Sequence, residues 1–190
     1  MHALLVSTVV VAIAEIGDKT QLLAVLLATR FRRPWPIIAG ILVATVGNHL
    51  LAAAVGVFLS DILQGFWFRL LVGVSFLAMA GWALIPDKPD EDKATTARFG
   101  VFVTTVIAFF LVEIGDKTQV ATVALAARFH SVVLVAMGTT IGMMLANVPA
   151  VLLGERATRV VPLKWVRLGA ALIFAALGVW AVVQAFSGAR

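Results

Sequence analysis

Acidic side chains occur twice inside apolar stretches of this 190-residue chain, each time within the same seven residues, Glu-Ile-Gly-Asp-Lys-Thr-Gln. The first copy covers residues 15–21 and the second covers residues 113–119. Apolar runs precede and follow each copy, so the carboxyl groups are predicted to lie near the middle of a lipid bilayer. An ionised carboxylate at that depth costs about 2.5 kcal/mol or more on insertion scales, and it therefore indicates a functional site.

The side chains of the motif have the composition of a site for a hard divalent cation. On a continuous helix, Glu15, Asp18 and Gln21 would share one face, because residues three apart are neighbours on the helix surface. Carboxylate and amide oxygens suit Ca²⁺, Mn²⁺ or Mg²⁺, and the chain has no cysteine to offer a thiolate. Brought together from both copies, the predicted metal ligands are Glu15, Asp18, Gln21, Glu113, Asp116 and Gln119.

The same carboxylates are also predicted to couple transport to protons. Together with Lys19 and Lys117, the four carboxylates carry a charge of about −2, which one divalent cation would balance. Without the cation, clustered carboxylates in a low-dielectric environment take up protons. Competition between cation and protons therefore predicts antiport, and the predicted proton-coupling residues are Glu15, Asp18, Glu113 and Asp116.

Secondary candidates lie within or near the motif copies. Gly17 and Gly115 permit either close helix packing or an unwound turn whose carbonyl groups face an ion. The other candidates are polar side chains that could complete the coordination or hydrogen-bond a ligand. They are Thr20, Thr118, Asn48, His49 and Asn147.

A purely structural explanation of the motif is the alternative. Each glutamate precedes a lysine by four residues, so the two could form a buried salt bridge that holds helices together. That explanation leaves Asp18 and Asp116 without obvious cationic partners, and the site hypothesis is therefore favoured.

The elements that must position these residues are predicted to be membrane-spanning helices. The chain is 62% hydrophobic and 13% charged, with a mean hydropathy of +1.04, which is typical of an integral membrane protein. The fold class is therefore all-α, with six transmembrane helices arranged as two inverted three-helix repeats. The predicted spans are residues 3–28, 35–59, 66–85, 100–127, 132–154 and 165–186.

An internal duplication is the basis for the two repeats. A shift of 98 residues aligns 15–82 with 113–180 without a gap, with 21 identities in 68 positions, and it places His49 opposite Asn147. The predicted units are a first repeat at 1–85, a cytoplasmic polar linker at 86–99 and a second repeat at 100–190. Because each repeat has three spans, an odd number, the second enters the membrane in the opposite sense, as in many secondary transporters.

Loop charges predict the orientation. Ten lysines and arginines fall on one predicted side of the membrane and three on the other, so the first side is assigned to the cytoplasm and both termini to the outside. The first group is Arg30, Arg32, Arg33, Lys88, Lys93, Arg98, Arg156, Arg159, Lys164 and Arg167, and the second is Arg69, Arg128 and Arg190. The net charge of +5 thus has a topological explanation, and no nucleic-acid partner is predicted.

A duplicated Glu-x-Gly-Asp-Lys-Thr on the first and fourth of six hydrophobic spans resembles the Golgi and bacterial Ca²⁺/Mn²⁺–proton antiporter family. The resemblance extends over residues 3–186 and implies that the four motif carboxylates bind the cation, with the two glutamines as neighbours. A compact prokaryotic member is the better fit, which implies Mn²⁺ export across the cytoplasmic (inner) membrane and places Ca²⁺ second. The implied partners are the divalent cation, protons and the bilayer, with no cofactor beyond the transported ion.

Three other functions were weighed. An exporter of a small organic cation, such as a basic amino acid, would share the three-plus-three plan. An intramembrane aspartyl protease would need a Gly-x-Gly-Asp motif, which Gly17-Asp18 matches only loosely, and the glutamate and glutamine beside each aspartate would have no role. A membrane scaffold would leave the acids unexplained. The interpretation as a transporter, and not an enzyme, is therefore favoured.

Overall fold

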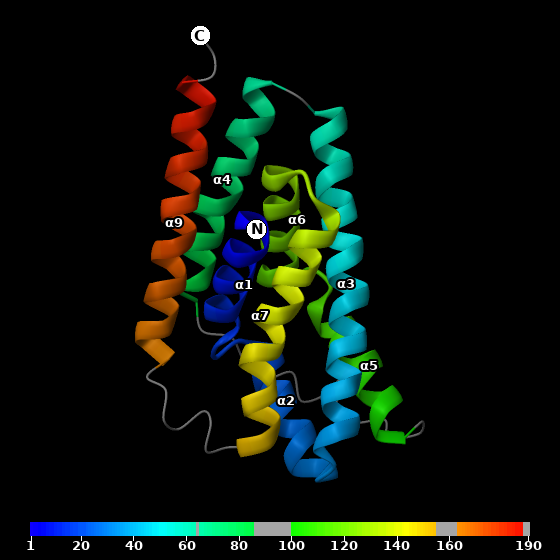
Figure 1. The fold of residues 1–190 in the computed structure, drawn as a ribbon. Helices are drawn as coiled ribbons and strands as arrows, with labels where there is room; N and C mark the ends of the chain where they lie inside the picture. The colour runs from blue at the N-terminus through cyan, green and yellow to red at the C-terminus, as the bar shows by residue number, and fades with distance from the viewer. Residues whose placement is uncertain (64, 86–99, 155–162, 188–190) are drawn as a thin grey trace.

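The computed structural model describes residues 1–63, 65–85, 100–154 and 163–187, and all regular secondary structure within these ranges is helical. The predicted linker at 86–99, and with it Lys88, Lys93 and Arg98, lies outside the described residues, as do Arg156, Arg159 and Arg190. Figure 1 shows the described helices as one elongated bundle.

Within the described residues, each half of the chain contributes two short helices followed by two long ones. In the first half these are α1 (His2–Glu15), α2 (Lys19–Phe31), α3 (Pro34–Ile62) and α4 (Phe66–Ala83). In the second half they are α5 (Gly100–Glu113), α6 (Lys117–Phe129), α7 (Val132–Leu153) and α9 (Leu163–Ser187).

The predicted helices at 35–59, 66–85, 132–154 and 165–186 are confirmed as α3, α4, α7 and α9, within a few residues at their ends. The predicted spans at 3–28 and 100–127 are not single helices. Each of these segments is divided at the motif into two helices that are 13 or 14 residues long.

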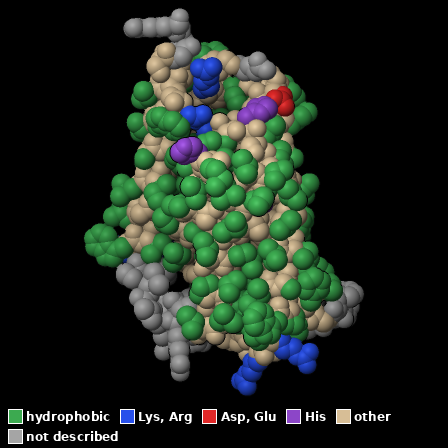
Figure 2. All heavy atoms as spheres, viewed as in Figure 1, with side chains coloured by type: hydrophobic (Ala, Val, Ile, Leu, Met, Phe, Trp, Pro, Cys, Tyr) green, Lys and Arg blue, Asp and Glu red, His purple; other side chains and the backbone are tan. Residues whose placement is uncertain are grey.

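Length and composition identify a multi-pass membrane protein. Four helices of the described chain, α3, α4, α7 and α9, are long and apolar enough to cross a bilayer, and α1 and α5 are shorter apolar helices. Figure 2 shows hydrophobic side chains covering the middle of the visible face, with lysines and arginines gathered towards its two ends. This distribution fits a protein surrounded by lipid.

Helix packing follows the same plan in both halves, with the partners exchanged. Helix α1 packs on α7 while its counterpart α5 packs on α3, and α6 packs on α3 while its counterpart α2 packs on α7. The counterpart helices α4 and α9 pack on each other, as do α3 and α7, and in Figure 1 each of these two pairs runs in opposite directions. Phe76 and Phe174, 98 positions apart, stack with ring centroids 6.5 Å apart.

Glycines allow the closest helix contacts. A Cβ atom at Gly40 of α3 would lie 2.7 Å from the Thr105 Cβ of α5. A Cβ at Gly138 of α7, the equivalent position, would lie 2.5 Å from the Leu4 carbonyl oxygen of α1. A methyl group at either glycine would therefore push α3 away from α5 or α7 away from α1, and α5 and α1 are the helices that end at the motif glutamates.

Candidate functional site

Both motif copies interrupt a helix in the same way. Helix α1 ends at Glu15 and α2 begins at Lys19, with Gly17 between them at φ +79°, and Gly115 adopts φ +76° at the equivalent break. Residues with a Cβ atom rarely adopt this conformation, so the turn favours glycine. The chain is therefore unwound at Gly17 and Gly115, and carbonyl groups that face an ion at these turns stay a prediction. The continuous helical face that was expected to align the acidic and amide side chains of the motif is not formed.

The two glutamines stabilise these turns. The Gly17 N–H donates to the Gln21 Oε1 at 2.8 Å, and the Gly115 N–H donates to the Gln119 Oε1 at 2.6 Å. The Gln21 amide nitrogen also donates to the Ala146 carbonyl of α7 at 3.1 Å. In this conformation the predicted ligand oxygens of both glutamines thus accept hydrogen bonds from backbone N–H groups.

The four carboxylates are almost completely buried, and the two aspartates are paired across the halves. Glu15, Asp18, Glu113 and Asp116 are at most 2% exposed. The Lys19 Nζ lies 3.1 Å from the Asp116 Oδ1, and the Lys117 Nζ lies 2.5 Å from the Asp18 Oδ1. The expectation that the aspartates would lack cationic partners is therefore wrong, because each half supplies the lysine for the other half's aspartate.

The glutamates are also bound by side chains from the opposite half. The Glu113 carboxylate lies 2.7 Å from the His49 Nε2 and accepts a hydrogen bond from the Asn48 Nδ2 at 3.1 Å. The Glu15 Oε1 accepts a hydrogen bond from the Asn147 Nδ2 at 3.2 Å. The three polar candidates on α3 and α7 thus lie next to the motif, and their direct contact with an ion remains a prediction.

Several buried oxygen atoms have no hydrogen-bond partner within the described residues. They include the Glu15 Oε2, the Asn147 Oδ1 and the Thr20 Oγ1, whereas the Thr118 hydroxyl donates to the Asp116 carboxylate at 3.2 Å. Electrostatic repulsion from three other carboxylates, those of Asp18, Asp116 and Glu113, also acts on Glu15. Buried polar atoms are normally satisfied, so unsatisfied oxygens among like charges are suited to an additional cation.

The carboxylates do not form a metal cage in this conformation. In the described part of the chain, no three acidic, histidine or cysteine side chains are placed so that they could hold a metal ion. The reason is that each aspartate faces an ammonium group instead of the other carboxylates. Binding of a cation by all four carboxylates therefore requires the lysines to move.

Arg167 is a further neighbour of the site, although its sequence position suggested only a loop charge. It lies within α9 and lines a cavity of about 10 Å³ together with Asp18, Lys117, Gly17 and Phe174. This volume holds about one water molecule. The sequence contained a signal for this position of Arg167, because Arg69 and Arg167 are equivalent in the duplication and both lie inside predicted spans.

Comparison with known proteins identifies the family. The model of the family described as divalent cation/proton antiporter GDT1 matches the chain twice, over residues 3–91 and 101–189. A protein of Vibrio cholerae named "Putative manganese exporter" is 51% identical over 175 residues, which cover 92% of this chain and 87% of the relative. The "GDT1-like protein sll0615" of Synechocystis is 27% identical over 188 residues, which cover 86% and 88%.

No solved structure is significantly similar to the chain. The two family matches are separated by the same 98 residues as the two motif copies, and together they include both sets of buried carboxylates. The family consists of transporters, which argues against the protease hypothesis. The chain belongs to the GDT1 family of divalent cation/proton antiporters.

Proposed function

We propose that this protein exports Mn²⁺ from the cytoplasm in exchange for protons, with Ca²⁺ as the second candidate ion. Membership of a divalent cation/proton antiporter family supports the reaction, and the name of the Vibrio cholerae relative supports manganese. The single observation on which the proposal depends is the burial of four carboxylates, at most 2% exposed, around two broken helices. Hard carboxylate oxygens bind Mn²⁺ and Ca²⁺, and the same oxygens bind protons when the cation leaves.

The proposed binding residues are the four motif carboxylates, which also carry the protons. Gln21 and Gln119 are proposed as additional ligands, although each would have to release the backbone N–H that it now accepts. Thr20, Asn147 and His49 are secondary candidates, supported by unsatisfied or acid-facing atoms. Mn²⁺ and Ca²⁺ differ in ligand number and distance, so the number of these residues that reach the ion would decide selectivity.

The two lysines are proposed to compete with the transported cation. In the conformation described here, Lys19 neutralises Asp116 and Lys117 neutralises Asp18. Of the four motif carboxylates, the two glutamates therefore form no salt bridge with a lysine among the described residues. An entering divalent cation would attract all four carboxylates and displace the ammonium groups. When the cation leaves, the return of the lysines would prevent four negative charges from remaining together in a medium of low dielectric constant.

Alternating access is proposed to follow from two inverted repeats, residues 1–85 and 100–190, with six membrane segments in all. Each broken helix pair, α1 with α2 and α5 with α6, would count as one segment. The exchanged packing of counterpart helices and their opposite directions support this arrangement. The excess of positive loop charge supports an inner-membrane orientation with both termini outside.

The decisive experiment measures Mn²⁺ uptake into inside-out vesicles with an imposed acid-inside gradient. Wild-type protein should accumulate Mn²⁺, and Asp116→Asn should reduce the flux at least about tenfold, because it removes a charged ligand from the site. Asp61→Asn is the matched control, since it makes the same chemical change on a side chain that is 57% exposed at the end of α3. Equal flux in wild type and Asp116→Asn would disprove transport through the motif.

A further inference from the structure

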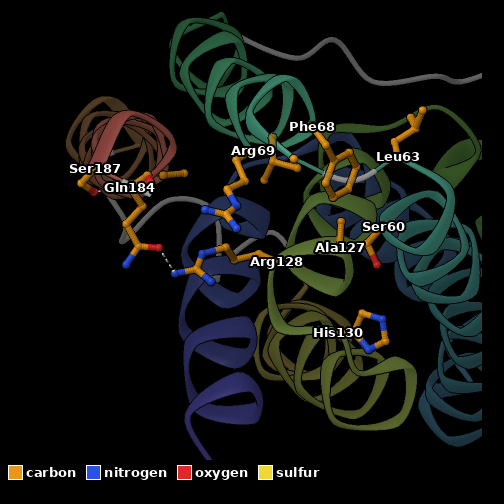
Figure 3. A pocket seen from close by; sticks show the side chains of 12 residues that line it. Ser60, Leu63, Phe68, Arg69, Ala127, Arg128, His130, Gln184 and Ser187 are labelled. Atoms are coloured by element: carbon orange, nitrogen blue, oxygen red, sulfur yellow. Dashed lines mark hydrogen bonds between the residues drawn. The ribbon is translucent and has the colours of Figure 1, made fainter. Parts of the chain in front are cut away.

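A cavity of about 670 Å³ lies at the end of the bundle where α3 ends, α4 begins and α6 and α9 end. Its lining includes Phe68, Arg69, Arg128, His130 and Gln184. It is separate from the motif, because none of the four carboxylates lines it. Figure 3 shows the side chains of Arg69 and Arg128 close to each other, one from α4 and the other from α6.

Arg128 of this arginine pair is held by neutral groups. The Arg128 guanidinium donates to the Gln184 Oε1 at 2.6 Å and lies 4.3 Å from the ring centroid of Trp180. Within the described residues, no carboxylate forms a salt bridge with Arg69 or Arg128.

Asp61, an acid beside this cavity, is bound to another side chain. The Asp61 carboxylate lies 2.7 Å from the His130 Nε2, and His130 lines the cavity. The equivalent arginine in the other half has a different environment, because Arg167 lines its narrow cavity together with Asp18. Among the described residues, an arginine whose cavity has no acidic side chain in its lining is therefore found at this end of the molecule and not at the equivalent position of the other half.

We propose that Arg69 and Arg128 together bind a phosphate group in this cavity. Two guanidinium groups present planar sets of N–H donors that match phosphate oxygens, and an anion between them would remove their mutual repulsion. The cation–π contact with Trp180 and the bond to Gln184 hold Arg128 in place before the ligand arrives. The phosphate belongs either to inorganic phosphate or to the headgroup of an anionic phospholipid, since this end of the bundle lies beside the bilayer surface.

Two binding measurements distinguish these sources. Protein in an uncharged detergent at low ionic strength is titrated with sodium phosphate, with sodium chloride at equal ionic strength as reference, and thermal unfolding is followed. In parallel, native mass spectrometry counts phosphatidylglycerol and phosphatidylcholine molecules retained by each chain. Arg69→Gln/Arg128→Gln is compared with wild type and with Arg33→Gln, which removes an exposed arginine at the opposite end of the bundle.

We expect wild type and Arg33→Gln to bind one of the probes at least about tenfold more tightly than the double variant, because two charge-assisted contacts are lost. Stabilisation by phosphate identifies the free anion, whereas selective retention of phosphatidylglycerol identifies the lipid headgroup. Failure of both probes to bind wild type, or equal binding by the double variant, overturns the proposal. If the double variant does not fold, Arg128→Lys replaces it and should still weaken binding, because lysine keeps the charge and loses the planar fork.

Discussion

The two halves of the molecule carry identical motifs but surround them differently. Both aspartates receive a lysine from the opposite half, so this exchange is the same in each direction. The glutamates differ, because the Glu113 carboxylate lies against His49 and Asn48, whereas the Glu15 carboxylate accepts a hydrogen bond only from Asn147 among the described residues. The duplication has thus preserved the charged pairs and allowed the glutamate partners, His49 and its equivalent Asn147, to diverge.

The strongest test of this comparison is the loss of each glutamate. Glu15→Gln and Glu113→Gln should each reduce Mn²⁺ flux at least about tenfold, because both halves contribute a charged oxygen ligand to one proposed site. Vesicle flux at saturating Mn²⁺ measures the loss, with Asp61→Asn as the charge-matched control. Near-normal flux in one of the two variants would show that the site belongs to a single half.

The lysines should reveal a difference in burial between the halves. Lys117→Met leaves Asp18 buried without its partner, and we expect a cost of about 3 kcal/mol in the free energy of unfolding. Lys19→Met should cost less, because the Lys19 side chain is 24% exposed and that of Lys117 is 7% exposed. Unfolding in detergent micelles measures both values.

A double variant separates this ion-pair effect from general damage. Lys117→Met combined with Asp18→Asn should recover part of the stability lost in Lys117→Met, since no unpaired charge is then buried. Additive losses would contradict the assigned pairing between Lys117 and Asp18.

A smaller effect is expected from making the two glutamate environments alike. His49→Asn should retain most of the flux, because an amide can donate to Glu113 as Asn147 donates to Glu15. His49→Leu leaves a carboxylate oxygen without this partner and should cost about 1–3 kcal/mol in stability. The KM for Mn²⁺ distinguishes the two possible roles of His49. If His49 is a ligand of the ion, His49→Asn should change KM strongly, and if it only positions Glu113, KM should stay close to that of wild type.

The smallest effect concerns the residues that directly follow α2 and α6. Arg32 and His130 occupy equivalent positions with φ of +51°, but only His130 titrates near neutral pH. The hydrogen bond and the charge of Asp61 raise the pKa of His130 above its ordinary value. Asp61→Asn should therefore lower this pKa, as measured by NMR titration of the imidazole protons.

The sign of the accompanying stability effect follows from this shift. The raised pKa in the folded protein gives a stabilisation that is present below the unfolded-state pKa and is lost as the pH rises through the folded-state pKa. The effect should be barely measurable, since His130 and Asp61 are 63% and 57% exposed. A large stability change in Asp61→Asn would contradict this placement.

The parts of the fold that were predictable depend on one property, the length of each apolar run. Helices α3, α4, α7 and α9 follow directly from it. The breaks at Gly17 and Gly115 do not, because the apolar pattern continues through them and the sign of φ at a glycine is not encoded in hydropathy. Unwinding at these glycines was therefore foreseen only as one option, and the helix ends on either side of them were not predicted.

The residues of the site were more predictable than their partners. Asn48, His49 and Asn147 were recognisable because polar side chains are rare in apolar spans, and all three lie beside the motif glutamates. The pairing of Lys19 with Asp116 was not predictable from local spacing. Sequence spacing describes neighbours on one helix, whereas this contact depends on how the two halves meet.

The exchange of lysines between the halves has a consequence for biosynthesis. When the first half leaves the ribosome, the Asp116 carboxylate and the Lys117 ammonium group that pair with Lys19 and Asp18 in the folded protein have not yet been translated. Neither half can form these two ion pairs alone. The first half must therefore remain in a hydrated or chaperone-bound environment until the second half has been synthesised.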